Sequence, residues 1–241
     1  MKLKVLASSS KGNGYLLQSE GGDCLLVEVG LQHQDLLRGL DYDIKRIVGC
    51  LITHEHKDHS FSLQYMLGSG IHVLAPKSVF KVTNQFATIA EHKHKYKIGE
   101  FSVIALQAYH DVPCMCYVIE HPELGKLLFA TDTYKLPYRI KHLNHLMIEC
   151  NYTDDALAYN EEHGYCPKSL RDRLMLSHME LETTKKVIKA NMSDELQDVV
   201  LLHLSNDNSD ADRMTGEISS LGIPVHIARK GLEIDYNLQP Y

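Results

Sequence analysis

The segment 53–60 constrains the chain more than any other part of its sequence. It places three histidines and one aspartate within six positions, in the order His54-x-His56-x-Asp58-His59, directly after an apolar run. Imidazole nitrogens and carboxylate oxygens are ligands that zinc and related divalent ions take in proteins. A strand that ends here would hold His54 and His56 toward one ion, and Asp58 and His59 toward a second. The alternative is a histidine-rich surface loop, since the chain has 15 histidines, but the regular spacing favours a metal site.

Two catalytic ions need more ligands than these four, because each ion takes about three protein ligands and leaves one position open. Three later runs have the composition of strands and end in suitable residues. They are 101–109, followed by His110, then 126–130, followed by Thr131-Asp132-Thr133, and 199–202, followed by His203. An acidic residue at a strand end, such as Asp132, suits a carboxylate that bridges two ions. A single histidine of this kind is more often structural, so the prediction depends on the recurrence of the pattern.

The order of these motifs resembles that of the metallo-β-lactamase superfamily of hydrolases, over nearly the whole chain. Residues 7–15, Ala-Ser-Ser-Ser-Lys-Gly-Asn-Gly-Tyr, and residues 202–208, Leu-His-Leu-Ser-Asn-Asp-Asn, resemble the opening and closing motifs of its YycJ/WalJ-type branch. Residues 177–180, Ser-His-Met-Glu, together with 200–205, are similar to the paired histidine motifs of ribonuclease Z. Those relatives hydrolyse phosphodiesters.

The resemblance implies an α/β fold, namely a four-layer αββα sandwich of two mixed sheets flanked by helices, formed by a single domain over residues 1–241. It also implies a ligand set, with His54, His56 and His110 on the first ion, Asp58, His59 and His203 on the second, and Asp132 bridging the two. The expected cofactors are two divalent metal ions, zinc first, with manganese or iron as alternatives. The superfamily usually has Asp where Glu28 ends the early strand here, and it uses that residue to support the histidine loop.

The mechanism expected of such a site is metal-assisted hydrolysis, in which the ions make hydroxide available near neutral pH and neutralise phosphate oxygens. The predicted catalytic residues are Asp58, His178 and Glu149. His178 matches the histidine that relatives place beside the scissile phosphate, and an imidazole can protonate the leaving oxygen. Glu149 ends the apolar run 146–148. It is expected either to orient His178 or the water, or to cap the following helix or hold a structural lysine.

The predicted function is that of a phosphodiesterase of the nuclease or exonuclease kind, acting on single-stranded DNA or RNA. The net charge of −6 argues against broad coating of duplexes, although it is compatible with a local basic groove. Lys168, Arg171 and Arg173 precede His178 and either face a phosphate chain or form a solvated helix face. The alternatives are a cyclic-nucleotide or other small-molecule phosphodiesterase, a lactam or thioester hydrolase, and a metal-stabilised binding module. A homodimer is an open alternative for the assembly.

The rest of the sequence predicts a cytoplasmic protein with no membrane partner. No run approaches the roughly 18 apolar residues of a membrane span, and the six cysteines without C-x-x-C spacing suit reduced thiols. Strands are predicted at 2–7, 14–19, 23–28, 47–53, 71–75, 101–108, 115–120, 126–131, 145–149, 198–203, 224–228 and 232–236, and helices near 33–40, 61–68, 77–87, 153–163, 168–174, 180–191 and 209–221. The stretch 150–177 is expected to be the least regular part between two motif strands, and the lysine-rich segment 92–97 to lie at the surface beside a loop.

Overall fold

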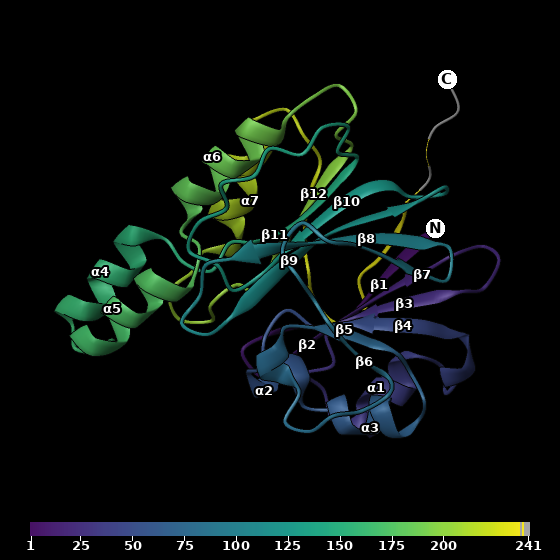
Figure 1. The fold of residues 1–241 in the computed structure, drawn as a ribbon. Helices are drawn as coiled ribbons and strands as arrows, with labels where there is room; N and C mark the ends of the chain where they lie inside the picture. Colours follow the sequence, from purple (N-terminus) through teal and green to yellow (C-terminus); the bar gives the residue numbers. More distant parts are fainter. Residues whose placement is uncertain (237, 239–241) are drawn as a thin grey trace.

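Two seven-stranded sheets lie face to face, with helices on their outer sides (Figure 1). The structure is a computed structural model that describes residues 1–236 and 238. Each sheet contains both parallel and antiparallel pairs of strands. The arrangement confirms the predicted α/β class and the αββα sandwich.

The first sheet takes six of its strands from the N-terminal part of the chain and one from the C-terminal part. Its order is β14-β1-β2-β3-β4-β5-β6. The strands are β1 (Lys2–Ser9), β2 (Gly12–Gln18), β3 (Cys24–Val27), β4 (Ile47–Leu51), β5 (Val73–Ala75), β6 (Ala87–Ile89) and β14 (Glu233–Asp235). The helices of this half are α1 (His33–Gly39), α2 (Lys57–Ser60) and α3 (Leu63–Gly68), with 3-10 turns at Ile44–Arg46 and Lys77–Val79.

The second sheet has the order β13-β12-β11-β10-β9-β8-β7. Its strands are β7 (Lys95–Ile98), β8 (Phe101–Ala108), β9 (Cys114–His121), β10 (Gly125–Ala130), β11 (His145–Glu149), β12 (Asp198–Leu202) and β13 (Val225–Ile227). The helices that follow are α4 (Asp154–Glu162), α5 (Lys168–Ser177), α6 (Leu181–Asn191) and α7 (Ala211–Ser219). α4 and α5 project from one end of the sandwich in Figure 1.

The main core lies between the sheets, because alternate side chains of their strands point inward. Leu3 and Val5 of β1 belong to the same buried cluster as Phe101 and Val103 of β8. β11 and β12 are buried along their whole length, as expected of parallel strands that are covered on both faces. Outer clusters join the first sheet to α1 and α3, and the second sheet to α6 and α7. Both sheets are therefore held firmly where their strands end.

The helix predicted at 77–87 is wrong. After Pro76 the chain makes only a 3-10 turn, and it then forms β6, which pairs in parallel with β5. The side chain of Asn84 accepts a hydrogen bond from the backbone N–H of Phe86, which gives the backbone a local alternative to the helical bond. Pairing with the open edge of β5 then stabilises residues 87–89 as a strand.

Two segments have more regular structure than the sequence predicted. The stretch 150–177 holds α4 and α5, at the places where helices were predicted, so it is not the least regular part. The segment 92–97 contributes β7, an edge strand on which Lys95 and Lys97 are exposed. Lysines on an edge strand discourage pairing with another chain. Their exposure was therefore predicted correctly, whereas the hydrogen bonding of their backbone was not.

All six cysteines are unpaired and buried. In the described part of the chain, no helix combines the length and the apolar content that crossing a bilayer requires.

Candidate metal centre

The predicted ligands lie together because strands of both sheets end at the same edge of the sandwich. These strands are β3 and β4 of the first sheet, and β8, β10, β11 and β12 of the second. The side chains at or just after their ends are Glu28, His54, His110, Asp132, Glu149 and His203. α2 adds Asp58 and His59, and His56 directly precedes it. Residues that are far apart in the sequence thus come within contact distance.

His54, His56, His110 and Asp132 form the first group of candidate ligands. Each offers one nitrogen or oxygen, and these atoms all lie within 4.8 Å of one another. His56 Nδ1 is 3.3 Å from His110 Nε2, and His54 Nε2 is 3.5 Å from Asp132 Oδ2. His54 and Asp132 are buried, whereas His56 is partly exposed. The group corresponds to the ligand set expected for the first ion.

Asp58, His59, Asp132 and His203 form the second group, within the same 4.8 Å limit. His59 Nε2 is 3.2 Å from Asp58 Oδ2 and 3.1 Å from Asp132 Oδ2. His203 Nε2 is 3.5 Å from Asp58 Oδ2. Asp132 belongs to both groups, as a bridging carboxylate requires. The structure therefore brings together all seven residues that were predicted as ligands.

The donor atoms of the two groups fit divalent cations. Nε2 of His54 and Nε2 of His203 are buried and have no hydrogen-bond partner within the described chain, although each lies 3.5 Å from a carboxylate oxygen. A buried nitrogen without a partner is costly, and a cation held between imidazoles and carboxylates would satisfy both kinds of group. The geometry thus supports sites for divalent metals.

Residues behind the ligands hold them in one orientation. His54 Nδ1 is 2.9 Å from Thr53 Oγ1, and that hydroxyl donates to a carboxylate oxygen of Glu28. The same carboxylate oxygen is 3.3 Å from His59 Nδ1. With Nδ1 of each ring beside these partners, Nε2 lies on the side of the ligand-group carboxylates, where a metal ion could bind it. Glu28 therefore reaches the histidine loop, where it lies beside His59 and is linked to His54 through Thr53.

The buried charges of the site favour a cation. Burial alone would raise the pKa of Asp132, but His203 and the other histidines outweigh it and hold the pKa well below its usual range. Burial lowers the pKa of His54 and of His110, which favours the neutral form that binds metals. Burial also acts to lower the pKa of His203, yet Asp132 and Asp58 prevail and raise it to about 10. The carboxylates thus draw positive charge to this edge, which a metal ion can supply.

Three residues at these strand ends have left-handed backbone conformations. They are Glu28 at φ 64°, Asp132 at φ 50° and His203 at φ 54°. This region is uncommon for residues with a Cβ atom, and it is retained where surrounding contacts enforce it. At each of these turns the side chain points into the candidate centre, where it contacts one or both ligand groups.

His178 lies beside the ligands and is paired with Glu149. Its Nδ1 is 2.6 Å from Glu149 Oε1, and its ring stacks on that of His203 with centroids 5.4 Å apart. Glu149 is completely buried, and its other oxygen accepts hydrogen bonds from two backbone N–H groups. The capping alternative for Glu149 is wrong, because Thr153 caps α4. Within the described chain, its ion-pair partners are His178 and His203, and the lysine alternative is not observed.

Sequence analysis missed Asp111 as a residue of the site. Asp111 Oδ1 is 3.1 Å from His110 Nε2, and Oδ2 is 3.4 Å from Arg173 Nη2 on α5. The signal that could have identified it is its position directly after a strand-end histidine. Its carboxylate joins the first ligand group to the helical hairpin of α4 and α5.

The three basic residues of α5, Lys168, Arg171 and Arg173, have different surroundings. Arg173 reaches Asp111, as described above. Arg171 instead pairs with Glu161 of α4 at 3.2 Å, and Lys168 is exposed at the start of the helix. Arg173 is thus the member of the cluster that contacts the candidate centre.

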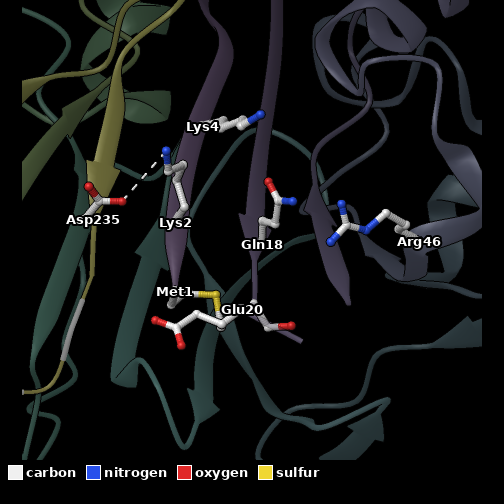
Figure 2. A pocket seen from close by; sticks show the side chains of 8 residues that line it. Met1, Lys2, Lys4, Gln18, Glu20, Arg46 and Asp235 are labelled. Atoms are coloured by element: carbon white, nitrogen blue, oxygen red, sulfur yellow. Dashed lines mark ion pairs between the residues drawn. The ribbon is translucent and has the colours of Figure 1, made fainter. Parts of the chain in front are cut away.

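A separate pocket of about 350 Å³ lies at the opposite end of the first sheet (Figure 2). It is lined by the beginning of β1 and the end of β2, and includes Lys2, Lys4 and Arg46. Glu233 and Asp235 lie within ion-pair distance of Lys2, and Arg46 donates to a backbone carbonyl. These basic groups already have partners, so the pocket carries no functional assignment.

Comparison with known proteins gives two sequence relatives. No protein-family model matches the chain. An exodeoxyribonuclease YycJ from Bacillus anthracis is 27% identical, over 87% of this chain and 84% of its own length. A ribonuclease Z from Clostridium kluyveri is 30% identical over 44% of this chain and 42% of its own length.

Solved structures match over almost the whole chain. The metallo-β-lactamase fold protein YhfI from Bacillus subtilis superposes with a TM-score of 0.73 and 18% identity, covering 97% of this chain and 98% of the other. The short form of human tRNase Z gives a TM-score of 0.66 and 16% identity, covering 99% of this chain and 100% of the other. At these identities the likeness concerns the fold.

Proposed function

The chain has the metallo-β-lactamase fold, and from this premise we propose that it is a metal-dependent phosphodiesterase that acts on nucleic acid. The observation that carries the proposal is the pair of buried ligand groups that share Asp132. The two sequence relatives are named as nucleases, which supports phosphodiesters as the bond type. We further propose that residues 1–241 form one domain, because the main core takes side chains from both sheets.

We propose that His54, His56 and His110 hold one ion, that Asp58, His59 and His203 hold the other, and that Asp132 bridges them. Zinc is the proposed metal, with manganese and iron as alternatives, since all three accept imidazole and carboxylate ligands. When bound, two divalent ions supply Lewis acidity, which withdraws charge from phosphate oxygens and makes water a better nucleophile.

The proposed role of His178 is to protonate the leaving oxygen. Glu149 lies at its Nδ1, so the N–H of that nitrogen points into the protein and Nε2 is left for the substrate. The buried carboxylate also stabilises the protonated ring. Asp58 is proposed to be catalytic as well as a ligand, because its side chain is 24% exposed at the rim and can orient an incoming water.

Single-stranded nucleic acid is the proposed substrate. Arg173 lies on the exposed hairpin beside the ligand groups, where it can meet a phosphate next to the one that is cleaved. The rings of Tyr159 and His163 on the same hairpin stack at 4.0 Å, and Tyr159 is exposed. Exposed aromatic rings on the same hairpin as a basic side chain suit unpaired bases better than a duplex.

The test is a substrate panel with the purified, metal-replete protein. It should hydrolyse bis-p-nitrophenyl phosphate and 5′-labelled single strands, a chelator should stop both reactions, and His56→Ala should remove them by weakening an ion site. Cyclic mononucleotides and nitrocefin complete the panel. Hydrolysis of nitrocefin without any phosphodiester would refute the assignment, and cleavage of cyclic nucleotides alone would replace nucleic acid with a small-molecule substrate.

A further inference from the structure

The turn between β1 and β2 packs directly against the second ligand group. This turn lies within the small-residue segment 7–15, to which the proposed reaction assigns no role. Gly30, in the segment after β3, packs so closely against the histidine loop that an added Cβ atom would lie 1.6 Å from the backbone oxygen of Asp58. Gly30 N in turn donates to the backbone oxygen of Asn13 at 2.9 Å. The turn, the segment after β3 and the histidine loop thus form one packed unit.

Asn13 is completely buried at the centre of this unit. Its Nδ2 donates to the backbone oxygens of Ser9 and Asp58, at 3.0 and 3.2 Å, and lies 3.1 Å from His59 Nε2. Its Oδ1 accepts from the backbone N–H of Ser9 at 3.1 Å. One side-chain amide therefore ties the turn to the backbone of a ligand and contacts the ring of the next. An aspartate could not do this, because it lacks the donor and would add a carboxylate beside Asp58.

Ser8 and Tyr15 extend the same contact to the remaining ligand of the second ion. Ser8 Oγ accepts a hydrogen bond from the backbone N–H of His203 at 3.1 Å. The hydroxyl of Tyr15 lies 2.8 Å from that Oγ and 3.3 Å from Asn13 Oδ1. His203 has the left-handed backbone described above, so the bond to Ser8 helps to hold a conformation that is uncommon outside glycine.

These contacts support the second ligand group and not the histidines of the first. In the described chain, Asn13 bonds to the backbone of Asp58 and lies against the ring of His59, and Ser8 bonds to the backbone of His203. Tyr15 links Ser8 to Asn13, and none of these three side chains hydrogen-bonds to a histidine of the first group. The first group has supports of its own: Thr53 contacts His54, and the backbone oxygen of Ser177 lies 2.8 Å from His110 Nδ1.

We propose that Asn13 is a positioning residue for the second metal ion, and that Tyr15 and Ser8 carry its effect to His203. The proposal rests on the metal centre of the proposed function, but not on which bond that centre cleaves. Residues that orient ligands change metal affinity by about ten- to a hundredfold when they are replaced. Asn13→Ala should therefore lower the affinity for the second ion by that factor and leave the affinity for the first ion unchanged.

The test is a calorimetric titration of chelator-treated protein with Zn²⁺. The metal content of each variant is also measured by elemental analysis after gel filtration. Asn13→Ala should retain about one ion per chain where the unaltered protein retains two. The matched control is Asn191→Ala. Asn191 is also a buried amide, which accepts from the backbone N–H of Ile140 at 2.7 Å and donates to the oxygens of Tyr138 and Val187, far from the centre. The control should lose thermal stability to a similar extent and still bind two ions.

Tyr15→Phe serves if Asn13→Ala does not fold, because it removes one hydroxyl and keeps the ring that contacts Phe129 at 5.2 Å. Tyr15→Phe should lower the affinity for the second Zn²⁺ ion and leave the affinity for the first unchanged. The proposal is overturned if Asn13→Ala, or Tyr15→Phe in its place, binds two ions with unchanged affinities. It is also overturned if Asn191→Ala loses the same ion, since general destabilisation would then explain the loss. Because no substrate is used, a failed activity panel leaves these outcomes unaffected.

Discussion

Replacing His178 with alanine separates acid catalysis from metal binding. The side chain is 15% exposed and faces Glu149 Oε1 at 2.6 Å, and it belongs to neither group proposed to hold the ions. A general acid contributes about a hundred- to ten-thousandfold in rate, which corresponds to about 2.7–5.4 kcal/mol of activation free energy. Glu149 keeps its hydrogen bonds from the N–H groups of Thr133 and Met179, at 3.0 and 3.2 Å. We therefore expect a loss in unfolding free energy of only about 1.5–3 kcal/mol.

The assay compares two leaving groups. On a single-stranded oligonucleotide the leaving sugar oxygen needs a proton, so the full loss in turnover is expected. On bis-p-nitrophenyl phosphate the leaving group departs as a stable anion, so the loss should be much smaller. Metal content and melting temperature are measured on the same samples. The matched control is His142→Ala, which removes a surface histidine that pairs with Glu195 at 2.9 Å and should leave both rates unchanged.

Equal losses on the two substrates, or a loss of metal in His178→Ala, would refute the assignment of His178. Loss of a purely structural histidine would affect both reactions alike. The ratio of the two rates, rather than either rate alone, carries the conclusion.

Three further predictions concern the ligands and their surroundings. Asp132→Ala should lower the occupancy of both ions, because its carboxylate belongs to both groups, and elemental analysis that finds one site fully occupied would contradict the bridging role. Glu28→Gln should cost about 1–3 kcal/mol of unfolding free energy in a denaturant titration, since it removes a charge that faces Thr53, and an unchanged midpoint would speak against that contact. Arg173→Ala should raise the KM for single strands several-fold without changing hydrolysis of bis-p-nitrophenyl phosphate, and Lys168→Ala is the control that should change neither. Equal effects of the two substitutions would assign Arg173 to the solvated surface.

The candidate ligands could be located from the sequence because each lies at or just after a segment with a distinctive local pattern. β11 and β12 contain the apolar runs 146–148 and 199–202, so Glu149 and His203 directly after these runs could be placed at the ends of strands. The spacing of His54 and His56 is likewise local. These features do not depend on how the rest of the chain folds.

The supporting contacts could not be located in this way. Asn13 lies 45 positions before Asp58, and their hydrogen bond exists only because two loops pack together in the closed sandwich. β6 was missed for a related reason, since the open edge of β5 that it joins is a property of the assembled sheet. Local patterns thus predicted which side chains gather at the candidate centre, whereas tertiary packing decided which residues hold them.

The ligand groups draw on both sheets, so a bound ion would also act as a cross-link between the two halves of the sandwich. A ligand that binds only the folded state adds about 2.7 kcal/mol of stability when its concentration is a hundred times its dissociation constant. Loss of metal would then open this edge to proteases as well as stop the reaction. The abundance of the protein in a cell would follow the supply of metal, and a drop in activity after metal starvation would partly measure degradation.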